Sequence, residues 1–525
     1  MITFIKNSKY QFVFMNPTKR IILNTFVQYF RSILNIVLSL FSTRYIVEAL
    51  GKSDYGIYLL VGGVIAMLGF ITNALVTTTQ RYISYHYGEN DILMVKKIFA
   101  NTLFVHIVVS LLLTIILFSL RDLFVFELLN IPTGREIIAQ KIYGITVCIL
   151  ITTILIAPYK AVFIAHENMA FISIVEICDG LLKLGIALIV LYLEADKLLM
   201  YAILMLVVQC FNFVSLFSYA WNKFDEARTL FSRKYIDKKC ILQLVGFAGW
   251  STYGMASVVF RSQGIQWMLN VTYSTVMNAA YGIGLQVYGS VSFVATSILN
   301  AMNPQIMKAE GEGNREKMLN LAEKESKYST MLLMLVLVPI LLEMPSILSF
   351  WLSEVPEYTD LFCRFILLGF IIDQCTYGIN VAIQAIGQIK LYTLIMYSPK
   401  LLVLIPIYLL LDNGYSPFIV MCVYLLSELL VSIARIPYIK YACGLKIWHF
   451  FKSVIFPLLP LLFLELFVGI ASMALFEMKY RFLLTILLSV SLGIIVIWFL
   501  LFSRNERGYI LNIVENVINI KNKKI

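Results

Sequence analysis

Long apolar segments constrain the fold of this chain more than any other feature of its sequence. Each has about 20 residues or more, the length that a helix needs to cross the hydrocarbon core of a bilayer. The sequence contains about 14 such segments, at residues 22–47, 55–80, 99–119, 137–158, 169–193, 198–220, 241–268, 276–302, 327–350, 360–384, 391–411, 416–437, 454–476 and 481–503. The runs are continuous rather than alternating, which favours helices over a barrel. Hydrophobic residues make up 60% of the sequence and charged residues 14%. We therefore predict an all-α polytopic membrane protein.

The net charge of +11 would indicate a nucleic-acid partner in a soluble protein. Here most of the 42 Lys and Arg residues fall in loops and tails on one side of the predicted spans. Such residues precede the first span and follow the last, at Lys6, Lys9, Lys19, Arg20, Arg504, Arg507, Lys521, Lys523 and Lys524. This asymmetry predicts that both termini are cytoplasmic and that nucleic acid is not a partner. No short apolar stretch is followed by a small-residue cleavage site, so we expect no cleaved signal peptide.

The eight cysteines and four histidines form no metal-binding or disulfide pattern. No CxxC occurs, and most cysteines lie inside predicted spans, where they serve as small apolar packing residues. The histidines lack HExxH or i,i+4 spacing. We expect no metal site and no cofactor.

Two stripes of polar residues occur at helical spacing within apolar spans. The first stripe is Asn24, Gln28, Arg31, Asn35, Ser39 and Ser42, and the second is Gln243, Gly246, Trp250, Gly254, Ser257, Arg261 and Gly264. Steps of three and four residues place each stripe on one helix face. Each stripe contains one arginine, so we predict that the two helices line a common cationic cavity.

Short identities at a near-constant offset indicate an internal duplication. Tyr55-Gly56-Ile57 matches Tyr281-Gly282-Ile283, and Gln80 and Gly88 match Gln305 and Gly313. An even number of spans separates the matching helices, so the copies would insert in the same direction and be related by a pseudo-two-fold axis along the membrane normal. The predicted organisation is a six-helix lobe at 1–220, a basic cytoplasmic linker at 221–240, a second six-helix lobe at 241–440, and two extra helices with a cytoplasmic tail at 441–525.

Several charged residues fall inside the predicted spans, where an unpaired charge costs on the order of 2.5–3.5 kcal/mol. The cations are Arg31, Arg44, Lys183, Arg261, Arg364 and Lys400, and the carboxylates include Glu176, Asp179, Asp373, Glu428 and Glu465. Arg44 and Arg364 lie near span ends and can snorkel to water. Arg31 and Arg261 lie on the polar stripes, which favours a role in substrate binding.

The remaining intramembrane charges form three groups. Glu176, Asp179 and Lys183 share one face of a helix, either as a plain ion pair or as a cation and proton site. Lys400 follows Pro399, and Asp373 is its nearest candidate partner. Glu428 and Glu465 are either packed or protonated, and Glu465 lies outside the duplication.

Further polar and glycine faces occur on the second and eighth spans. They comprise Asn73, Thr77 and Gln80 on one, and Gly282, Gln286, Gly289, Thr296 and Asn300 on the other. Small-residue helix packing is one explanation. Amides donate and accept hydrogen bonds at once, which favours a sugar-facing surface for Asn73, Gln80 and Gln286.

The segment from Arg44 through Leu50-Gly51-Lys52-Ser53-Asp54-Tyr55-Gly56 to Tyr58 resembles Wzx-type polysaccharide-biosynthesis flippases, in the superfamily that also holds multidrug/cation antiporters and lipid II flippases. Pro158 through Ala165-His166-Glu167-Asn168 resembles a loop pattern of the same family. The resemblance implies a bacterial inner-membrane protein that moves an undecaprenyl-pyrophosphate-linked oligosaccharide outward by alternating access. It also implies membrane lipids, a glycan polymerase and other glycan-assembly proteins as partners.

Under this hypothesis the arginines attract the pyrophosphate and the amides accept the glycan. The candidates for substrate binding in the lumen are Arg31, Arg261, Lys183, Lys400, Gln28, Asn35, Asn73, Gln80 and Gln286. Asp179, Glu176 and Asp373 are the candidates for coupling transport to H⁺ or Na⁺. The main alternative is a multidrug/cation antiporter, although Arg31 would repel a cationic drug. A membrane enzyme such as a glycan polymerase is a third class, but the large outer loops on which such enzymes carry catalytic groups are missing. We therefore expect a transporter, not an enzyme.

Overall fold

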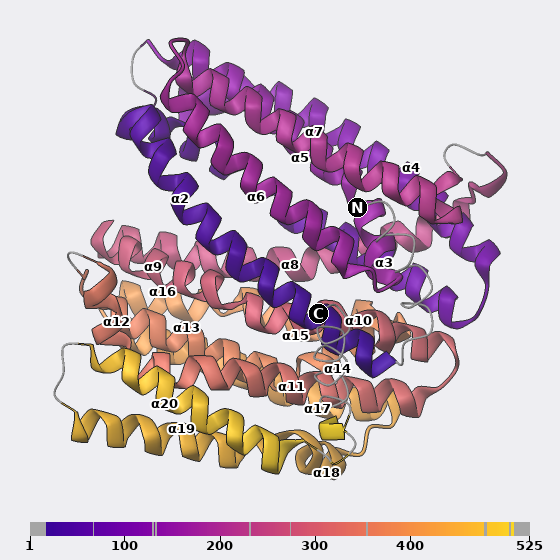
Figure 1. Cartoon of the computed structure of the whole chain (residues 1–525), viewed down its shortest axis with the longest axis vertical. Coiled ribbons are helices and arrows are strands. Elements are labelled where there is room, and N and C mark those ends of the chain that lie inside the picture. Colours follow the sequence, from indigo (N-terminus) through magenta and orange to yellow (C-terminus); the bar gives the residue numbers. More distant parts are fainter. Residues whose placement is uncertain are drawn as a thin grey trace, which may run out of the picture. The chain divides into compact units, whose positions relative to one another are not determined.

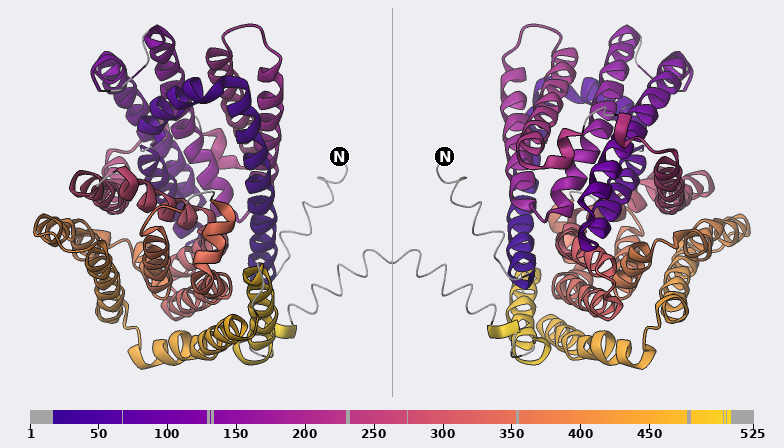
Figure 2. Two further views of the ribbon diagram at one scale, coloured as in Figure 1. Left: turned by 90° about the vertical axis from the view of Figure 1, so that its left-hand side faces the viewer. Right: turned by 90° about the vertical axis from the view of Figure 1, so that its right-hand side faces the viewer.

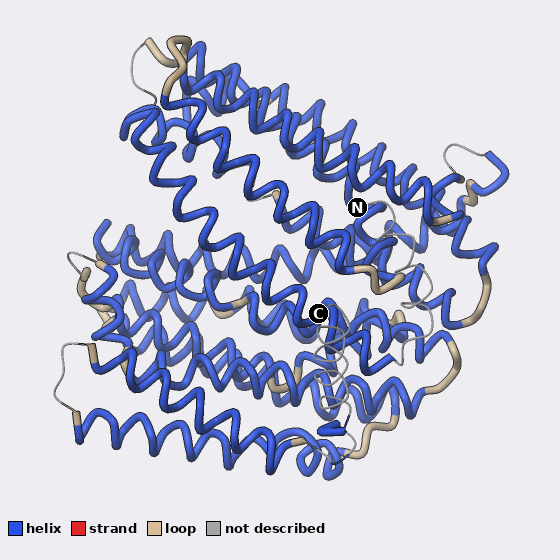
Figure 3. The backbone as a smooth tube through the Cα atoms, viewed as in Figure 1, coloured by secondary structure: helices blue, strands red, loops and turns tan. Residues whose placement is uncertain are grey.

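The structure of the chain is a computed structural model. It describes residues 17–508 except 67, 129–130, 132–133, 230–232, 274, 353–354, 477–479, 503 and 505. Lys6, Lys9, Lys521, Lys523 and Lys524, which contribute to the predicted charge asymmetry, lie outside these residues. The described residues form helices and loops and contain no strand (Figure 3).

The contacts divide the chain into two compact units. The first unit is Phe26–Ala256 with Gly311–Gly313, and the second unit is the chain up to Thr25, Ser257–Glu310 and the chain from Asn314 onward. The helix α8 contributes residues to both units. The predicted division at 1–220, 221–240, 241–440 and 441–525, and the duplication behind it, stay predictions.

The first unit is built mainly from α2 to α7 and the start of α8 (Figure 1). Its elements are α2 (Pro17–Ala66), α3 (Gly69–Gly88), α4 (Ile92–Ser119), η1 (Leu123–Leu128), α5 (Glu136–Ala165), α6 (Met169–Leu191), α7 (Lys197–Lys223), η2 (Asp225–Arg228), η3 (Arg233–Tyr235) and α8 (Lys238–Thr272). Helix α2 is interrupted at Gly51, whose φ of 73° is a conformation that glycine adopts readily. Side chains of Asp91 and Asp196 cap the first turns of α4 and α7.

The second unit continues through the C-terminal helices. Its elements are α9 (Thr275–Val291), α10 (Phe293–Gly311), α11 (Arg315–Leu342), α12 (Met344–Trp351), α13 (Thr359–Gln374), α14 (Tyr377–Ile386), α15 (Ile389–Leu402), α16 (Leu404–Asp412), α17 (Pro417–Cys443), α18 (Ile447–Phe450), η4 (Phe451–Ile455), α19 (Phe456–Leu475), α20 (Arg481–Val496) and η5 (Ile497–Leu501). Helix α11 packs against α14, α19 and α20. In the further views, α19 and α20 lie at the edge of this unit (Figure 2).

The fold class predicted from the sequence is confirmed. Among the described residues, nine helices are long and apolar enough to cross a membrane, and eleven spans result when two bent helix pairs, α9–α10 and α13–α14, each count as one. The other three predicted spans also fall on helices: 55–80 on the end of α2 and on α3, 169–193 on α6, and 241–268 on α8. Helix α6 carries three intramembrane charges, Glu176, Asp179 and Lys183, and α8 carries the second polar stripe.

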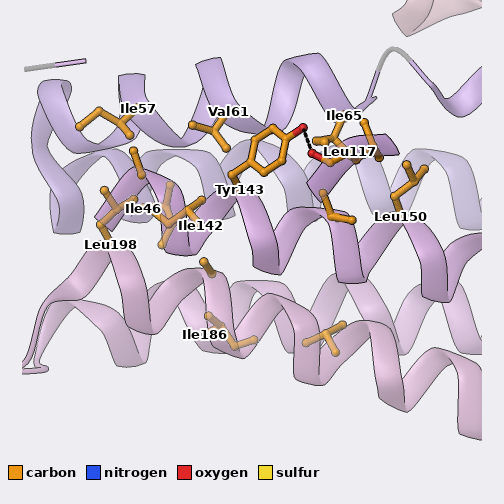
Figure 4. Close-up of a cluster of buried hydrophobic side chains, with 14 of the residues drawn as sticks. Ile46, Ile57, Val61, Ile65, Leu117, Ile142, Tyr143, Leu150, Ile186 and Leu198 are labelled. Atoms are coloured by element: carbon orange, nitrogen blue, oxygen red, sulfur yellow. Dashed lines mark hydrogen bonds between the residues drawn. The ribbon is translucent and has the colours of Figure 1, made fainter. Parts of the chain in front are cut away.

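Each unit has its own apolar core. In the first unit, side chains of α2, α5, α6 and α7 meet around Ile142 and Tyr143, and the Tyr143 hydroxyl donates to the carbonyl of Leu117 at 3.0 Å (Figure 4). In the second unit, a separate cluster joins α11 to α19 and η5 around Leu335 and Leu461. The cores hold the helices that carry the charged residues in register.

Candidate functional site

The first charge cluster lies in the first unit and consists of Arg31, Lys160, Glu176, Asp179 and Lys183. Arg31 on α2 forms an ion pair with Glu176 on α6. Lys160 on α5 contacts the other oxygen of Glu176 at 2.9 Å. One turn further along α6, Asp179 pairs with Lys183 at 2.8 Å. Three helices thus bring together three cations and two carboxylates, which leaves one positive charge in excess.

Two amides flank this cluster. The Asn212 amide donates to Asp179 at 2.7 Å. On the stripe of α2, the Asn35 Oδ1 lies so close to Gly180 that a Cβ at residue 180 would be 2.9 Å from it. A glycine at this position therefore lets α2 approach α6. Gln28 is also buried, and its Oε1 has no hydrogen-bond partner among the described residues.

The second charge cluster lies in the second unit and consists of Arg261, Asp373, Lys400, Glu428 and Arg435. The Arg261 guanidinium contacts Glu428 at 2.5 Å and lies 4.8 Å from the centre of the Tyr424 ring. Lys400 bridges Glu428 at 2.8 Å and Asp373 at 3.1 Å. Arg435 contacts the same oxygen of Asp373 at 2.8 Å. This cluster also holds three cations and two carboxylates.

The two clusters differ in burial. In the second cluster, the side chains of Arg435 and Glu428 are 1% and 3% exposed. In the first cluster, Lys183 is 41% exposed and Asp179 is 20% exposed. An ion pair is screened less when it is buried, so removing one member of the second cluster leaves a more costly unpaired charge than in the first.

Several predicted site residues lie apart from the clusters. Asn73 and Gln286 are exposed, and Gln80 is buried with its amide nitrogen unsatisfied. No hydrogen bond or ion pair among the described residues joins these three amides to either cluster. Their role in glycan binding stays a prediction, as does the shared cationic cavity.

The predicted contacts of the intramembrane charges are partly confirmed. Lys400 does pair with Asp373, and Lys183 pairs with Asp179 as an i,i+4 ion pair. Glu176, however, pairs across helices rather than with Lys183. Arg364 pairs with Asp360 one turn earlier on α13, at 2.9 Å. This ion pair explains the position of Arg364 near the end of its span without snorkelling.

Sequence reasoning missed Lys160 and Arg435, and it left the partners of Glu428 open. Lys160 lies beyond the predicted end of its span at 158, whereas α5 continues to Ala165. Arg435 lies inside the predicted span 416–437 but was not named among the intramembrane cations; in the structure it is buried on α17 (Pro417–Cys443). One signal was available, because Glu428 and Arg435 are seven residues apart and share a helix face.

Two further charged groups join helix ends of the first unit. Arg135 contacts both Asp196 and Asp54, which belongs to the Arg44–Tyr58 segment, each at 2.5 Å. Burial alone would raise the pKa of Asp196, but the backbone N–H of Leu199 and the Arg135 guanidinium hold it below its usual range. Asp54 thus has a structural role at the end of α5.

The second group is formed by Tyr87, His166 and Glu226. Both the Tyr87 hydroxyl and the His166 Nε2 lie 2.7 Å from Glu226 Oε1. Burial opposes ionisation of Glu226, but the hydrogen bonds from His166 and Tyr87 outweigh it and hold the pKa of Glu226 below its usual range.

The Tyr87, His166 and Glu226 group leads us to predict how the stability of the protein depends on pH. Because the pKa of Glu226 is lower in the folded protein, its contribution to stability is present above the unfolded value of about 4.3 and is lost as the pH falls through the folded value. We expect Glu226→Gln to cost about 1.5–3 kcal/mol at pH 6. The difference from wild type should shrink steadily at acidic pH. Thermal unfolding in detergent at a series of pH values measures this, and a difference that is constant with pH would contradict it.

Comparison with known proteins gives a likeness in structure alone. No family model and no curated protein matches the sequence. Among solved structures, the chain is similar to a MATE transporter crystallised in complex with MaD3S, with a TM-score of 0.70 and 13% identity over 83% of this chain and 98% of that chain. It is also similar to a multidrug resistance MATE family transporter of the MOP superfamily in an outward-facing conformation, with a TM-score of 0.71, 13% identity, and coverage of 82% and 96%.

A third solved structure is a MOP superfamily transporter from Pyrococcus furiosus, whose binding pocket is described as reversed in polarity, suggesting a different function. It matches with a TM-score of 0.69, 13% identity, and coverage of 82% of this chain and 96% of that chain. At such identities the likeness shows the fold, which is that of MATE transporters. These neighbours are transporters and not enzymes.

Proposed function

We propose that this chain is a transporter of the MOP superfamily that moves an anionic, polyprenyl-pyrophosphate-linked oligosaccharide to the outer leaflet by alternating access. The observation that carries the proposal is the excess of one positive charge in each of the two charge clusters. The fold likeness supports a transporter, and the resemblance of the Arg44–Tyr58 segment to Wzx flippases supports the glycan-linked substrate.

The pairing within the clusters favours an anionic substrate over a cationic one. Glu176, Asp373 and Glu428 each contact two cations. A cationic drug would have to displace one of these cations before it could bind a carboxylate. An anion needs no such displacement, because the cations outnumber the carboxylates.

The arginines also retain donors for an incoming anion. Among the described residues, the Nε atoms of Arg31, Arg261 and Arg435 have no hydrogen-bond partner. A guanidinium has five N–H donors in a planar fork, which matches the oxygens of a phosphate. In a low-dielectric setting these donors bind a pyrophosphate strongly.

The membrane potential provides a drive in the proposed direction. Moving negative charge out of a negative interior is favourable by about 2.3 kcal/mol per charge per 100 mV. Antiport of H⁺ or Na⁺ would add to this drive. Asp179, Glu176 and Asp373 are all paired with cations, which makes them poor acceptors for a coupling cation.

A multidrug/cation antiporter is the second candidate. It is favoured by the likeness to the multidrug resistance MATE family transporter. The Pyrococcus furiosus structure indicates, however, that one fold accommodates binding pockets of different polarity. The positive excess of both clusters is the observation that favours the anionic substrate.

The experiment follows radiolabelled surface glycan in cells that depend on this chain for its export. The variants are Arg31→Ala and Arg261→Ala, with membrane levels of each protein checked. We expect both to insert normally and to accumulate lipid-linked oligosaccharide inside. Arg364→Ala is the matched control, because Arg364 pairs with Asp360 and belongs to neither cluster. Unchanged export together with altered resistance to cationic dyes would replace the proposal with the antiporter.

A further inference from the structure

Glu465 on α19 is a buried carboxyl group that the two charge clusters do not use. It lies at the centre of the predicted span 454–476, and its exposed fraction is 0%. Neither of its oxygens has a hydrogen-bond partner among the described residues, and none of the ion pairs there includes it. Its neighbours include Leu335 and Leu461, and a Cβ on Gly493 would overlap Glu465 Oε1.

This setting determines the protonation state of Glu465. An ionised carboxylate buried without a cation or a hydrogen-bond donor costs many kcal/mol. The neutral acid carries no such cost. Glu465 is therefore protonated in this packing, and it can release the proton only to a neighbouring polar group.

A row of hydroxyl groups leads from Glu465 to one end of the helix pair α19–α20. Thr485 and Ser489 are fully buried on one face of α20, four residues apart, and Ser489 lies beside Glu465. Ser472, about 10 Å along α19 from Glu465, has its hydroxyl 2.6 Å from that of Thr485. The row thus spans the half of the membrane between Glu465 and the outer end of the predicted topology.

The outer end of the row meets a charged pair. Thr485 donates to Glu343 Oε1 at 2.9 Å, and Arg481 contacts the same oxygen at 2.9 Å. Glu343 thus has a cationic partner in Arg481 and a hydrogen-bond donor in Thr485, and both favour its ionised form. Glu343 is therefore an ionised acceptor at the mouth of the row.

The other titratable groups on elements that pack against α19 have partners of their own. Lys327 of α11 donates to the carbonyl of Leu501, Tyr328 of α11 donates to Glu506, and Lys452 of η4 lies over the Trp448 ring. Next to η4, His449 contacts Glu323 at 3.1 Å. None of these interactions includes Glu465.

We infer that Glu465 is a proton-binding site that exchanges its proton with the Glu343 end through the hydroxyls of Ser489, Thr485 and Ser472. Along this row, each hydroxyl accepts one proton on its oxygen and passes its own to the next, with one water bridging the turn between Ser489 and Thr485. Glu465 thus becomes a carboxylate when the proton leaves and a neutral acid when it returns. Use of this proton to drive transport rests on the proposed function, whereas proton binding itself does not.

The test uses infrared spectroscopy of the full-length protein in liposomes, with the proton as the probe. In wild type we expect a protonated-carboxyl C=O band that Glu465→Gln removes. Glu325→Gln is the matched control, since Glu325 is also fully buried in the second unit. Its substitution should leave the Glu465 band in place. An unchanged spectrum in Glu465→Gln would overturn the inference.

The route is tested by exchange into D₂O, which shifts the same band. We expect the double variant Thr485→Val/Ser489→Ala to retain the band but to exchange at least tenfold more slowly. Exchange at the wild-type rate would show that the hydroxyl row is not the route. Finally, dependence of glycan export on the pH gradient should be lost in Glu465→Gln and kept in Glu325→Gln. If wild type exports no glycan at all, the proposed function fails while the infrared result still decides the proton site.

Discussion

Glu428→Gln is expected to lower the free energy of unfolding of the second unit by about 3–5 kcal/mol. The side chain of Arg261 is 6% exposed, and Glu428 is the carboxylate that it contacts. Glutamine has nearly the same shape but no charge, so the substitution leaves a buried guanidinium without a counter-charge. The same change removes one of the two partners of Lys400. Thermal or denaturant-induced unfolding in detergent measures the loss.

The matched control for this prediction is Lys183→Met in the first charge cluster. It also removes one member of an ion pair, but Lys183 is 41% exposed, and such pairs contribute about 0–1 kcal/mol. A loss for Glu428→Gln no larger than for Lys183→Met would show that burial does not make the second cluster important for stability.

Lys400→Met is expected to separate stability from transport. Without Lys400, Asp373 still pairs with Arg435 and Glu428 still pairs with Arg261, so each carboxylate keeps a cation. Methionine fills a similar volume, and the unfolding free energy should change less than for Glu428→Gln. The positive charge in excess, however, is removed from the cluster.

The expected effect of Lys400→Met on transport is large. A unit charge about 8 Å from a substrate charge contributes about 2 kcal/mol at an effective dielectric constant near 20, or roughly 30-fold in affinity. Export of labelled lipid-linked oligosaccharide should fall accordingly, while the amount of folded protein in the membrane stays near that of wild type. A variant that folds and exports at the wild-type rate would show that the excess charge of the second cluster does not contribute to transport.

The fold was predictable because membrane spans depend on local composition. Apolar runs of sufficient length must be helical in a bilayer, whatever their neighbours, since each backbone polar group needs a partner within its own segment. The pairing of Lys183 with Asp179 was predictable for the same reason, because i,i+4 contacts depend only on helix geometry.

The partners of the clusters were less predictable because they depend on which helices meet. Glu176 has Lys183 on its own helix, yet it pairs with Arg31 and Lys160 on two others. Arg435 was overlooked although it lies inside the predicted span 416–437, because only the packing of α17 against other helices shows that its side chain is buried beside Asp373. Glu465 was given little weight because it lies outside the duplicated region. Whether a residue belongs to a repeat does not indicate whether its side chain is buried.

The most direct test of the proposed anionic substrate replaces the two members of one ion pair in turn. Binding of undecaprenyl pyrophosphate to the purified protein in lipid nanodiscs is measured for wild type, Arg31→Ala and Glu176→Gln. Both substitutions break the Arg31–Glu176 pair, but the first removes a positive charge and the second a negative one. We predict opposite effects, with affinity roughly 30-fold weaker for Arg31→Ala and stronger than wild type for Glu176→Gln. Equal losses in both variants, or wild type that binds tetraphenylphosphonium but not the pyrophosphate, would contradict this prediction.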